Sequence, residues 1–273
     1  MITIRQHAEG PAGQKPFDLT DRGLLLGDGV FDTSRVVNGK ILFMEEHLKR
    51  LLGDAAALGL SVDPAELRAF ALDVIPDEAD GALRLTITRG PGPRGLAPAS
   101  LGKPTLIAKF DEGAPAFPMA PLRLMVSDIH RNPTAPSSLR KTLAYTDAIS
   151  GLQRAKVAGF DEALYLTPSG NVACSSIANI VARFGDRLVT PPLKDGVVAG
   201  IMRAWLVRTA PGLGFEIDTA SMKLAEVEAA DALYLMNSLQ LIRPVSALGS
   251  AMFDPNLPDA LETACERLLE PAL

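Results

Sequence analysis

The chain of 273 residues has little cysteine, few histidines and no long apolar run. Its two cysteines, Cys174 and Cys265, are too few for a disulfide framework or a thiolate metal cluster, which favours a reducing compartment. The three histidines, His7, His47 and His130, are too scattered in the sequence to suggest a metal site. No serine is accompanied by the residues of a catalytic triad.

Positive charge is also scarce. The 27 lysines and arginines face 32 acidic residues, so the net charge is −5 at pH 7. Without a basic surplus the chain cannot displace the counterions of a phosphate backbone, and we expect no nucleic-acid partner. No stretch has the apolar length of a membrane span, and the first ten residues, MITIRQHAEG, lack the apolar core of a signal peptide. We therefore expect a cytoplasmic protein with no membrane partner.

The chain is rich in alternating strand and helix patterns, which predicts a mixed α+β architecture. Asn38-Gly39 joins two strand patterns and predicts a tight hairpin. Strands are predicted at residues 2–7, 30–37, 40–44, 82–90, 103–110, 123–129, 161–168, 172–184, 186–192, 215–221 and 231–249, the last of these interrupted by a turn. Helices are predicted at residues 45–60, 64–75, 141–158, 200–210, 224–232 and 258–270.

Two of these helices have expected buried positions. The first, residues 45–60, should bury Leu48, Leu51, Leu52 and Ala56. The helix that follows Lys141 should bury Leu143, Ile149, Leu152 and Val157. Between the strand and helix patterns, the prolines of EGAPAFPMAP forbid regular structure, which predicts a linker at residues 113–121 between a domain at 1–112 and a domain at 122–273.

Several motifs occur in a fixed order along the chain. GDGVFDTSRV occupies residues 27–36, Arg131-Asn132-Pro133 precedes Lys141-Thr142-Leu143, and GFDEAL follows at residues 159–164. In this combination the chain resembles the fold-type IV pyridoxal phosphate (PLP) enzymes of the class IV aminotransferase family. These include branched-chain and D-amino acid aminotransferases and 4-amino-4-deoxychorismate lyase.

The resemblance implies a two-domain α+β/α/β fold like that of D-amino acid aminotransferase, with PLP at the domain interface. It makes residues 122–273 the cofactor-binding domain and implies a homodimer. Lys141 would be the catalytic residue, holding PLP as a Schiff base, which requires a lowered pKa and to which the neighbouring Arg140 could contribute. Without the resemblance, Lys141 is an ordinary solvated charge at a helix end.

Other cofactor contacts are also carried over from the family. An arginine in the EHLxRL helix and two backbone segments hold the cofactor phosphate, and a tyrosine lies near its phenolic oxygen. The matching residues are Arg50, Gly200, Ile201, Met202, Asn237, Ser238 and Tyr145. The alternatives are an exposed helix arginine, an ordinary helix start and an ordinary β-turn.

On the substrate side, the resemblance makes Phe31 and Thr33 wall residues. The loop Thr88-Arg89-Gly90-Pro91-Gly92-Pro93-Arg94-Gly95 is similar to a loop of the lyase branch, where Arg89 or Arg94 could clamp a substrate carboxylate. Core packing of Phe31 and solvated loop arginines are the alternatives. The glycines near residue 27 match neither the Rossmann nor the Walker spacing, which excludes those nucleotide motifs.

One position departs from the family. The family motif GxVxExxxxN places a glutamate against the pyridine nitrogen of PLP, and this chain has Cys174 there. A thiol is normally neutral near pH 7 and cannot hold a pyridinium proton as a carboxylate does. A buried structural cysteine is the alternative.

The motifs together favour a lyase resembling 4-amino-4-deoxychorismate lyase, which forms p-aminobenzoate and pyruvate. The alternatives are an aminotransferase for D- or branched-chain amino acids, acting on small amino and keto acids, and a catalytically degenerate PLP-binding homologue.

Overall fold

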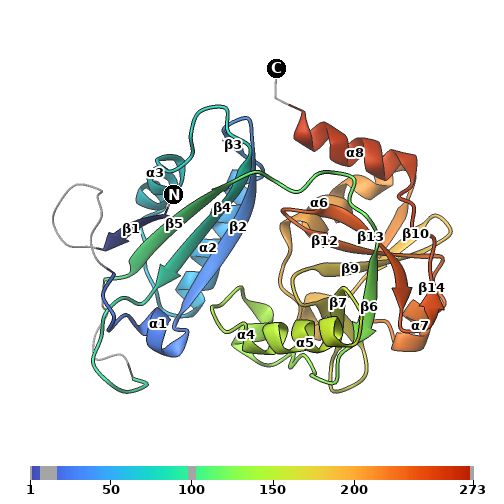
Figure 1. The fold of residues 1–273 in the computed structure, drawn as a ribbon, viewed down its shortest axis with the longest axis horizontal. Coiled ribbons are helices and arrows are strands. Elements are labelled where there is room, and N and C mark those ends of the chain that lie inside the picture. The colour runs from blue at the N-terminus through green and yellow to red at the C-terminus, as the bar shows by residue number, and fades with distance from the viewer. Residues whose placement is uncertain (1, 7–16, 98–102, 271–273) are drawn as a thin grey trace. The chain divides into compact units, whose positions relative to one another are not determined.

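The computed structural model describes residues 2–6, 17–97 and 103–270 (Figure 1). The chain forms two compact units. The first holds the chain up to Ala114 together with Arg140–Ala144, and the second holds Pro115–Leu139 and Tyr145–Glu270. The units therefore separate inside the stretch expected to be a linker. Arg140–Ala144, which the sequence analysis assigned to the second domain, belongs to the first unit because it hydrogen-bonds to that unit's sheet.

The first unit is built on a five-stranded antiparallel sheet. Its strand order is β1 (Ile2–Gln6), β5 (Thr105–Glu112), β4 (Gly81–Thr88), β2 (Gly29–Val37) and β3 (Lys40–Ile41). Asn38 and Gly39 have φ angles of 48° and 72°, as the predicted hairpin turn requires. β3 is shorter than predicted because Phe43, with a φ of 53°, turns the chain into the next helix.

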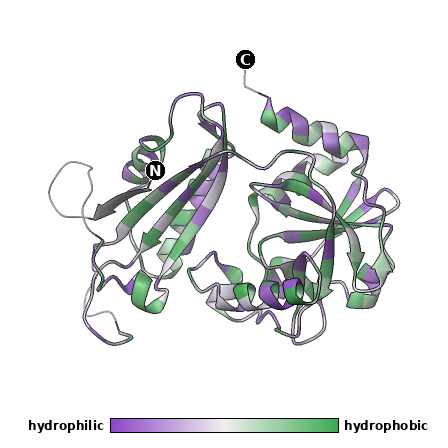
Figure 2. Cartoon of the chain, in the orientation of Figure 1, coloured by the Kyte–Doolittle hydropathy of each residue, from purple (hydrophilic) through white to green (hydrophobic). Residues whose placement is uncertain are grey.

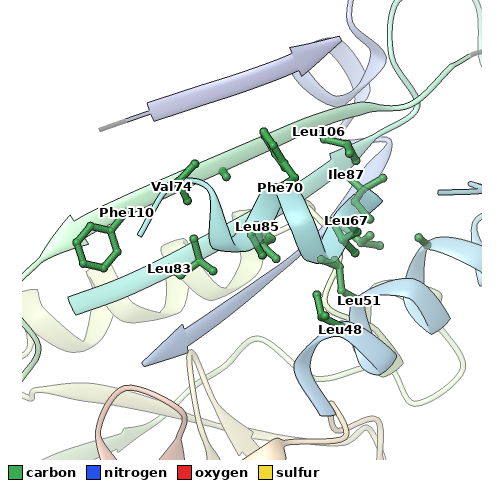
Figure 3. Close-up of a cluster of buried hydrophobic side chains, with 14 of the residues drawn as sticks. Leu48, Leu51, Leu67, Phe70, Val74, Leu83, Leu85, Ile87, Leu106 and Phe110 are labelled. Atoms are coloured by element: carbon green, nitrogen blue, oxygen red, sulfur yellow. The ribbon is translucent and has the colours of Figure 1, made fainter. Parts of the chain in front are cut away.

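Among the described residues, the helices of this unit are α1 (Arg22–Leu26), α2 (Met44–Ala57) and α3 (Pro64–Leu72). Figure 3 shows Leu48 and Leu51 of α2 and Leu67 and Phe70 of α3 gathered with side chains of β4 and β5 in one hydrophobic cluster. The predicted apolar stripe of α2 is correct for Leu48 and Leu51 but wrong for Ala56, which is exposed. Two polar residues of α2, His47 and Asp54, are buried instead.

The second unit contains a nine-stranded mixed sheet. β8 pairs with β9 as well as with β7, so part of the sheet closes on itself. The strands, in sheet order, are β11 (Glu216–Thr219), β10 (Arg187–Thr190), β9 (Asn179–Phe184), β12 (Ala232–Asn237), β13 (Leu241–Leu248), β6 (Leu122–Val126), β7 (Glu162–Leu166) and β8 (Val172–Ser175), with β14 (Ala251–Met252) on β13.

The helices of the second unit pack their small or apolar positions inward. They are α4 (Pro136–Leu139), α5 (Thr146–Val157), α6 (Ile201–Thr209), α7 (Leu224–Glu228) and α8 (Asp259–Leu269), with 3-10 turns at Leu193–Asp195 and Ala210–Leu213. α8 carries hydrophilic and hydrophobic residues in alternation (Figure 2) and buries Leu261 and Cys265. Within the described ranges, no helix is both long enough and apolar enough to cross a membrane.

The helix predicted to begin at Lys141 differs from the prediction. Residues 141–144 are not helical and α5 begins at Thr146. Ile149 and Val157, expected to be buried, are 55% and 90% exposed. α5 instead packs through Ala148, Gly151 and Ala155, because small side chains allow close contact with β7.

The strand predicted at residues 172–184 is likewise two strands, β8 and β9, joined by a turn at residues 176–178. Ser175 and Ala178 close this turn through a backbone hydrogen bond of 2.9 Å, and Cys174 pairs with Asn179 across it. A continuous apolar pattern does not reveal such a turn, because both strands are buried.

Two helical glycines provide a matched test of this packing. A Cβ at Gly151 of α5 would lie 2.0 Å from the Tyr165 hydroxyl, whereas a Cβ at Gly53 of α2 would meet nothing within 4 Å. We expect Gly151→Ala to destabilise the protein by about 1–3 kcal/mol through overpacking. Gly53→Ala should stabilise it by about 0.5–1 kcal/mol. Urea unfolding of both variants measures the difference, and equal effects would contradict the close packing of α5 on β7.

Candidate active site

The segment that carries Lys141 runs antiparallel beside β2. The Phe31 N–H donates to the Lys141 carbonyl at 2.9 Å, and the Leu143 N–H donates to the Gly29 carbonyl at 3.0 Å. A Cβ at Gly29 would lie 2.6 Å from the Ile87 carbonyl oxygen and 2.9 Å from Leu143 Cδ1, so only glycine permits this approach. The lysine therefore projects from an extended segment held by the first unit's sheet.

The side chain of Lys141 lies over an aromatic ring that the sequence analysis placed on the substrate side. Its Nζ is 4.2 Å from the centroid of the Phe31 ring, and the guanidinium carbon of Arg84 is 3.6 Å from the same centroid. Arg84 is also the cross-strand partner of Thr33. The structure thus brings Lys141, Phe31 and Thr33 together with a cation, Arg84, that the sequence analysis missed.

A signal for Arg84 was present in the sequence. It lies between Leu83 and Leu85 in a strand whose alternate residues face opposite sides of the sheet. Leu83 and Leu85 are buried in the cluster beneath α2 and α3. The arginine between them must therefore face the other side, where Phe31 and Thr33 lie.

Asp54, near the C-terminal end of α2, contacts the lysine segment directly. Its carboxylate accepts the Lys141 N–H at 2.9 Å and the Arg140 Nη1 at 3.2 Å. The Asp54 side chain is only 10% exposed. The charge of Arg140 is therefore paired with Asp54.

Arg50, one turn earlier on α2, lies in a buried ionic cluster. Its Nε and Nη2 donate to the two carboxylate oxygens of Asp32, each at 2.8 Å, and His47 Nδ1 lies 2.6 Å from the same carboxylate. Burial by itself would raise the pKa of Asp32. The charge of Arg50 and the hydrogen bonds from His47 and Arg50 outweigh burial and hold that pKa well below its ordinary value.

The two arginines of the loop at residues 88–95 differ in their surroundings. Arg89 donates from Nε and Nη2 to Asp28 at 2.7 and 3.0 Å, and from Nη2 to the Leu58 carbonyl at 2.6 Å. Arg22 holds the end of the loop through the Gly95 and Leu96 carbonyls, both at 2.7 Å. Since the Arg89 donors are engaged within the first unit, Arg94, which is exposed, is the better candidate for a carboxylate contact from this loop.

In the second unit, Gly200 is the N-cap residue of α6, and no side chain caps the first turn of the helix. A Cβ at Gly200 would lie 1.8 Å from Asn179 Oδ1, while Asn179 Nδ2 donates to the Val198 carbonyl at 3.0 Å. Asn179 thus fixes the chain just before the helix. The Ile201 and Met202 side chains are buried, so these residues offer backbone amides, which suit an anion such as a phosphate.

The other predicted cofactor residues of this unit lie in turns and at a helix start. Asn237 Oδ1 accepts the N–H groups of Leu239 and Gln240 at 3.0 and 2.8 Å, which shapes the turn after β12. Ser238, the next residue, is half-buried. Tyr145 is the half-buried N-cap residue of α5.

Cys174 is a buried free thiol on β8, packed against Ala173 and Val197. Burial raises its pKa, and the nearby charge of Arg131 only partly opposes this effect. The thiol is therefore neutral at pH 7.

Glu162 at the start of β7 supports the segment that follows Cys174. Its carboxylate accepts the N–H groups of Ala163 at 2.8 Å and Ser176 at 3.3 Å, and it is almost fully buried. The Ser176 hydroxyl also lies 3.3 Å from the Tyr165 hydroxyl. Glu162 was not among the predicted site residues, although a charged residue that opens an apolar strand is an available signal.

The sequence of the chain matches a known family. The model of the family described as amino-transferase class IV matches residues 29–248. The chain belongs to this family. The resemblance inferred from the motifs is confirmed, and the protein is an enzyme of the class IV aminotransferase family with pyridoxal phosphate as its cofactor.

Individual relatives carry different activities. A protein of Methanocaldococcus jannaschii, provisionally assigned as a branched-chain-amino-acid aminotransferase, is 31% identical over 82% of this chain and 80% of its own. The 4-amino-4-deoxychorismate lyase structure from Pseudomonas aeruginosa is 29% identical, with a TM-score of 0.82 and 98% of both chains covered.

A Mycobacterium tuberculosis hypothetical aminotransferase in its PLP-bound form has a TM-score of 0.81 at 21% identity, covering 98% of both chains. Together with the lyase structure from Pseudomonas aeruginosa, it confirms the expected α+β fold.

Glu162 yields a prediction for stability against pH. Burial raises the pKa of Glu162 above its ordinary value of 4.5, despite hydrogen bonds from Ser176 and Ala163. The unfolded chain therefore releases this proton first, and the wild type loses stability as the pH rises from about 4.5 to the folded pKa. The Glu162→Gln variant has no carboxyl group to titrate at this position, so it does not lose stability in this way. Its stability relative to wild type should improve between pH 4 and pH 7, measured by urea unfolding.

Glu45 is a control of opposite sign. Hydrogen bonding to Arg68 lowers the pKa of Glu45, which lies on the exposed surface of α2. Glu45→Gln should therefore show no gain in relative stability as the pH rises. If Glu162→Gln behaved like Glu45→Gln, the buried carboxylate would be as well solvated as a surface one.

Proposed function

We propose that this enzyme is a lyase resembling 4-amino-4-deoxychorismate lyase, releasing p-aminobenzoate and pyruvate. The observation that carries the proposal is the neutral, buried thiol of Cys174 at the place where the family motif has a glutamate. The lyase structure with 29% identity over nearly the full chain supports the same branch.

The residues present fit pyridoxal phosphate. The uncapped N-terminus of α6 and the glycine before it suit a phosphate group, and Arg50 and Ser238 are the further proposed phosphate contacts. Bound PLP supplies an electron-withdrawing ring that stabilises negative charge at the amine-bearing carbon of the substrate. Lys141 would hold the cofactor covalently until the substrate amine displaces it, and the freed Lys141 amine would then take the proton from that carbon. Phe31 and Thr33 would line the substrate side, and Tyr145 would help to orient the ring.

Cys174 decides how that proton is used. A carboxylate keeps a ring nitrogen protonated by charge attraction, whereas a neutral thiol is only a weak hydrogen-bonding partner. Without a carboxylate, negative charge spread into the ring is stabilised less. The rate of transamination, in which Lys141 would have to return the proton to a cofactor carbon, should fall most. The rate of an elimination that passes the electrons to a leaving group should fall least.

The second candidate is an aminotransferase for D- or branched-chain amino acids. The relative from Methanocaldococcus jannaschii, at 31% identity, favours it. Lys141 would take the same first proton and deliver it to a cofactor carbon. The third candidate is a degenerate homologue that binds PLP without useful turnover. The single observation in its favour is that Cys174 stands where the family motif has a glutamate.

The substrate in either case is a small amino or keto acid, and Arg84 and Arg94 are the proposed carboxylate contacts. Arg84 is favoured because it lies over the same ring as Lys141. The two cysteines are free, which supports a cytoplasmic enzyme.

A homodimer is also proposed. Three consecutive leucines of α1, Leu24, Leu25 and Leu26, are 47–61% exposed and leave apolar surface for a second copy to cover.

Lys141→Ala tests the catalytic assignment. The variant should lose covalent attachment of PLP, detected by mass spectrometry after borohydride reduction, together with nearly all turnover. Lys156→Ala is the control, because Lys156 lies on the surface of α5 with 57% of its side chain exposed. A Lys141→Ala enzyme that still bound PLP covalently would overturn the assignment.

Cys174→Glu tests the choice between elimination and transamination. The new carboxylate should raise the rate of transamination relative to that of p-aminobenzoate release, because it can hold the ring proton. Both rates are measured on one preparation, and Cys265→Ala, a second buried cysteine on α8, serves as the control. A wild type that transaminates rapidly and releases no p-aminobenzoate would refute the lyase proposal in favour of the aminotransferase.

A further inference from the structure

The backbone of Lys141 is held at both of its hydrogen-bonding groups. Its carbonyl accepts the Phe31 N–H at 2.9 Å, and its N–H donates to Asp54 Oδ2 at 2.9 Å. The first contact belongs to the sheet. The second comes from a side chain 87 residues away in the sequence, and no family motif used above includes it.

Asp54 is itself rigidly placed. It lies between Leu51 and Ala55 on the buried side of α2, and both of these neighbours are only 1% exposed. Its other carboxylate oxygen accepts from Arg140 Nη1 at 3.2 Å, so its negative charge is compensated. A buried carboxylate with both oxygens engaged on consecutive residues, Arg140 and Lys141, restricts where that segment can lie.

We propose that Asp54 is a positioning residue for Lys141. Its carboxylate fixes the lysine N–H, and so sets the point and direction from which the amine reaches the reacting carbon. The proposal rests on the catalytic role proposed for Lys141.

The same helix carries Arg50, one turn before Asp54 and thus on the same side of the helix. Arg50 donates to Asp32 of β2, so α2 is fixed to β2 by Arg50 and to the Lys141 segment by Asp54. These contacts reduce the freedom of Lys141 to shift relative to the sheet, and the orientation of a reacting group strongly affects its rate.

The test compares Asp54→Ala with Asp54→Asn in the PLP-loaded enzyme. Asp54→Ala removes the acceptor, and should lower kcat by about 10–100-fold while KM stays within about twofold. In enzyme that has been stripped of PLP and is then reloaded, it should also slow covalent attachment of PLP to Lys141, and it should speed hydrogen exchange of the Lys141 amide. Asp54→Asn keeps an oxygen that can accept the N–H, and should restore most of the rate and the exchange protection.

Asp63→Ala is the matched control. Asp63 also accepts backbone N–H groups, those of Ala65 and Glu66, but it caps α3 on the surface. Its loss should lower the melting temperature by about 2–4 °C and leave attachment and kcat unchanged. This control separates a general loss of stability from a loss of lysine positioning.

The outcomes separate the two proposals. If the wild type does not attach PLP at Lys141, the catalytic assignment fails. If the wild type attaches it and both Asp54 variants match the wild type in attachment rate, kcat and amide exchange, the positioning role fails. It also fails if Asp54→Asn is as impaired as Asp54→Ala, because the ion pair with Arg140 would then be the important contact.

Discussion

The pairing of residues 141–143 with β2 is the contact on which the site in the first unit depends. It requires Gly29, because a side chain there would strike both the neighbouring strand and Leu143. Once this pairing forms, Phe31 lies beneath the Lys141 amine and Thr33 lies farther along the same face. A short stretch of sheet hydrogen bonds thus brings the lysine to residues more than a hundred positions earlier in the chain.

The opposite face of β2 shows how the first unit uses buried charge. Asp32 points under α2 and meets Arg50 and His47, while Asp54 of α2 meets Arg140. Burying such groups costs desolvation, and in general an apolar core of similar volume would be at least as stable. Their benefit is specificity. Asp32 takes both of its partners from α2, and Asp54 of α2 takes both of its partners from Arg140 and Lys141. Only one register of α2 on the sheet satisfies both carboxylates.

The sequence allowed the local features to be predicted and concealed the long-range ones. Asn38-Gly39 predicts its hairpin because the turn demands positive φ angles. The helical spacing of apolar residues in α2 predicts that Leu48 and Leu51 are buried. The predicted buried face of α5 was wrong because close packing requires the small residue Gly151, and a hydrophobicity pattern does not mark glycine as a buried position. Contacts such as Asp54 with Lys141 and Arg89 with Asp28 join residues 87 and 61 positions apart, and no local pattern encodes them.

On the proposed site assignments, the second unit separates two tasks that the family motif combines. Asn179, the last residue of that motif, is kept, and its amide fixes the backbone before Gly200, so the start of α6 is preserved for an anion. The glutamate five positions earlier is replaced by Cys174, and burial keeps the thiol neutral. Binding a phosphate depends on backbone geometry, which Asn179 and Gly200 maintain. Control of the ring nitrogen depends on a single side-chain charge, which this chain lacks at Cys174. On the proposed assignments, a change confined to the second task would alter which reaction is favoured and would leave the means of holding the cofactor in place.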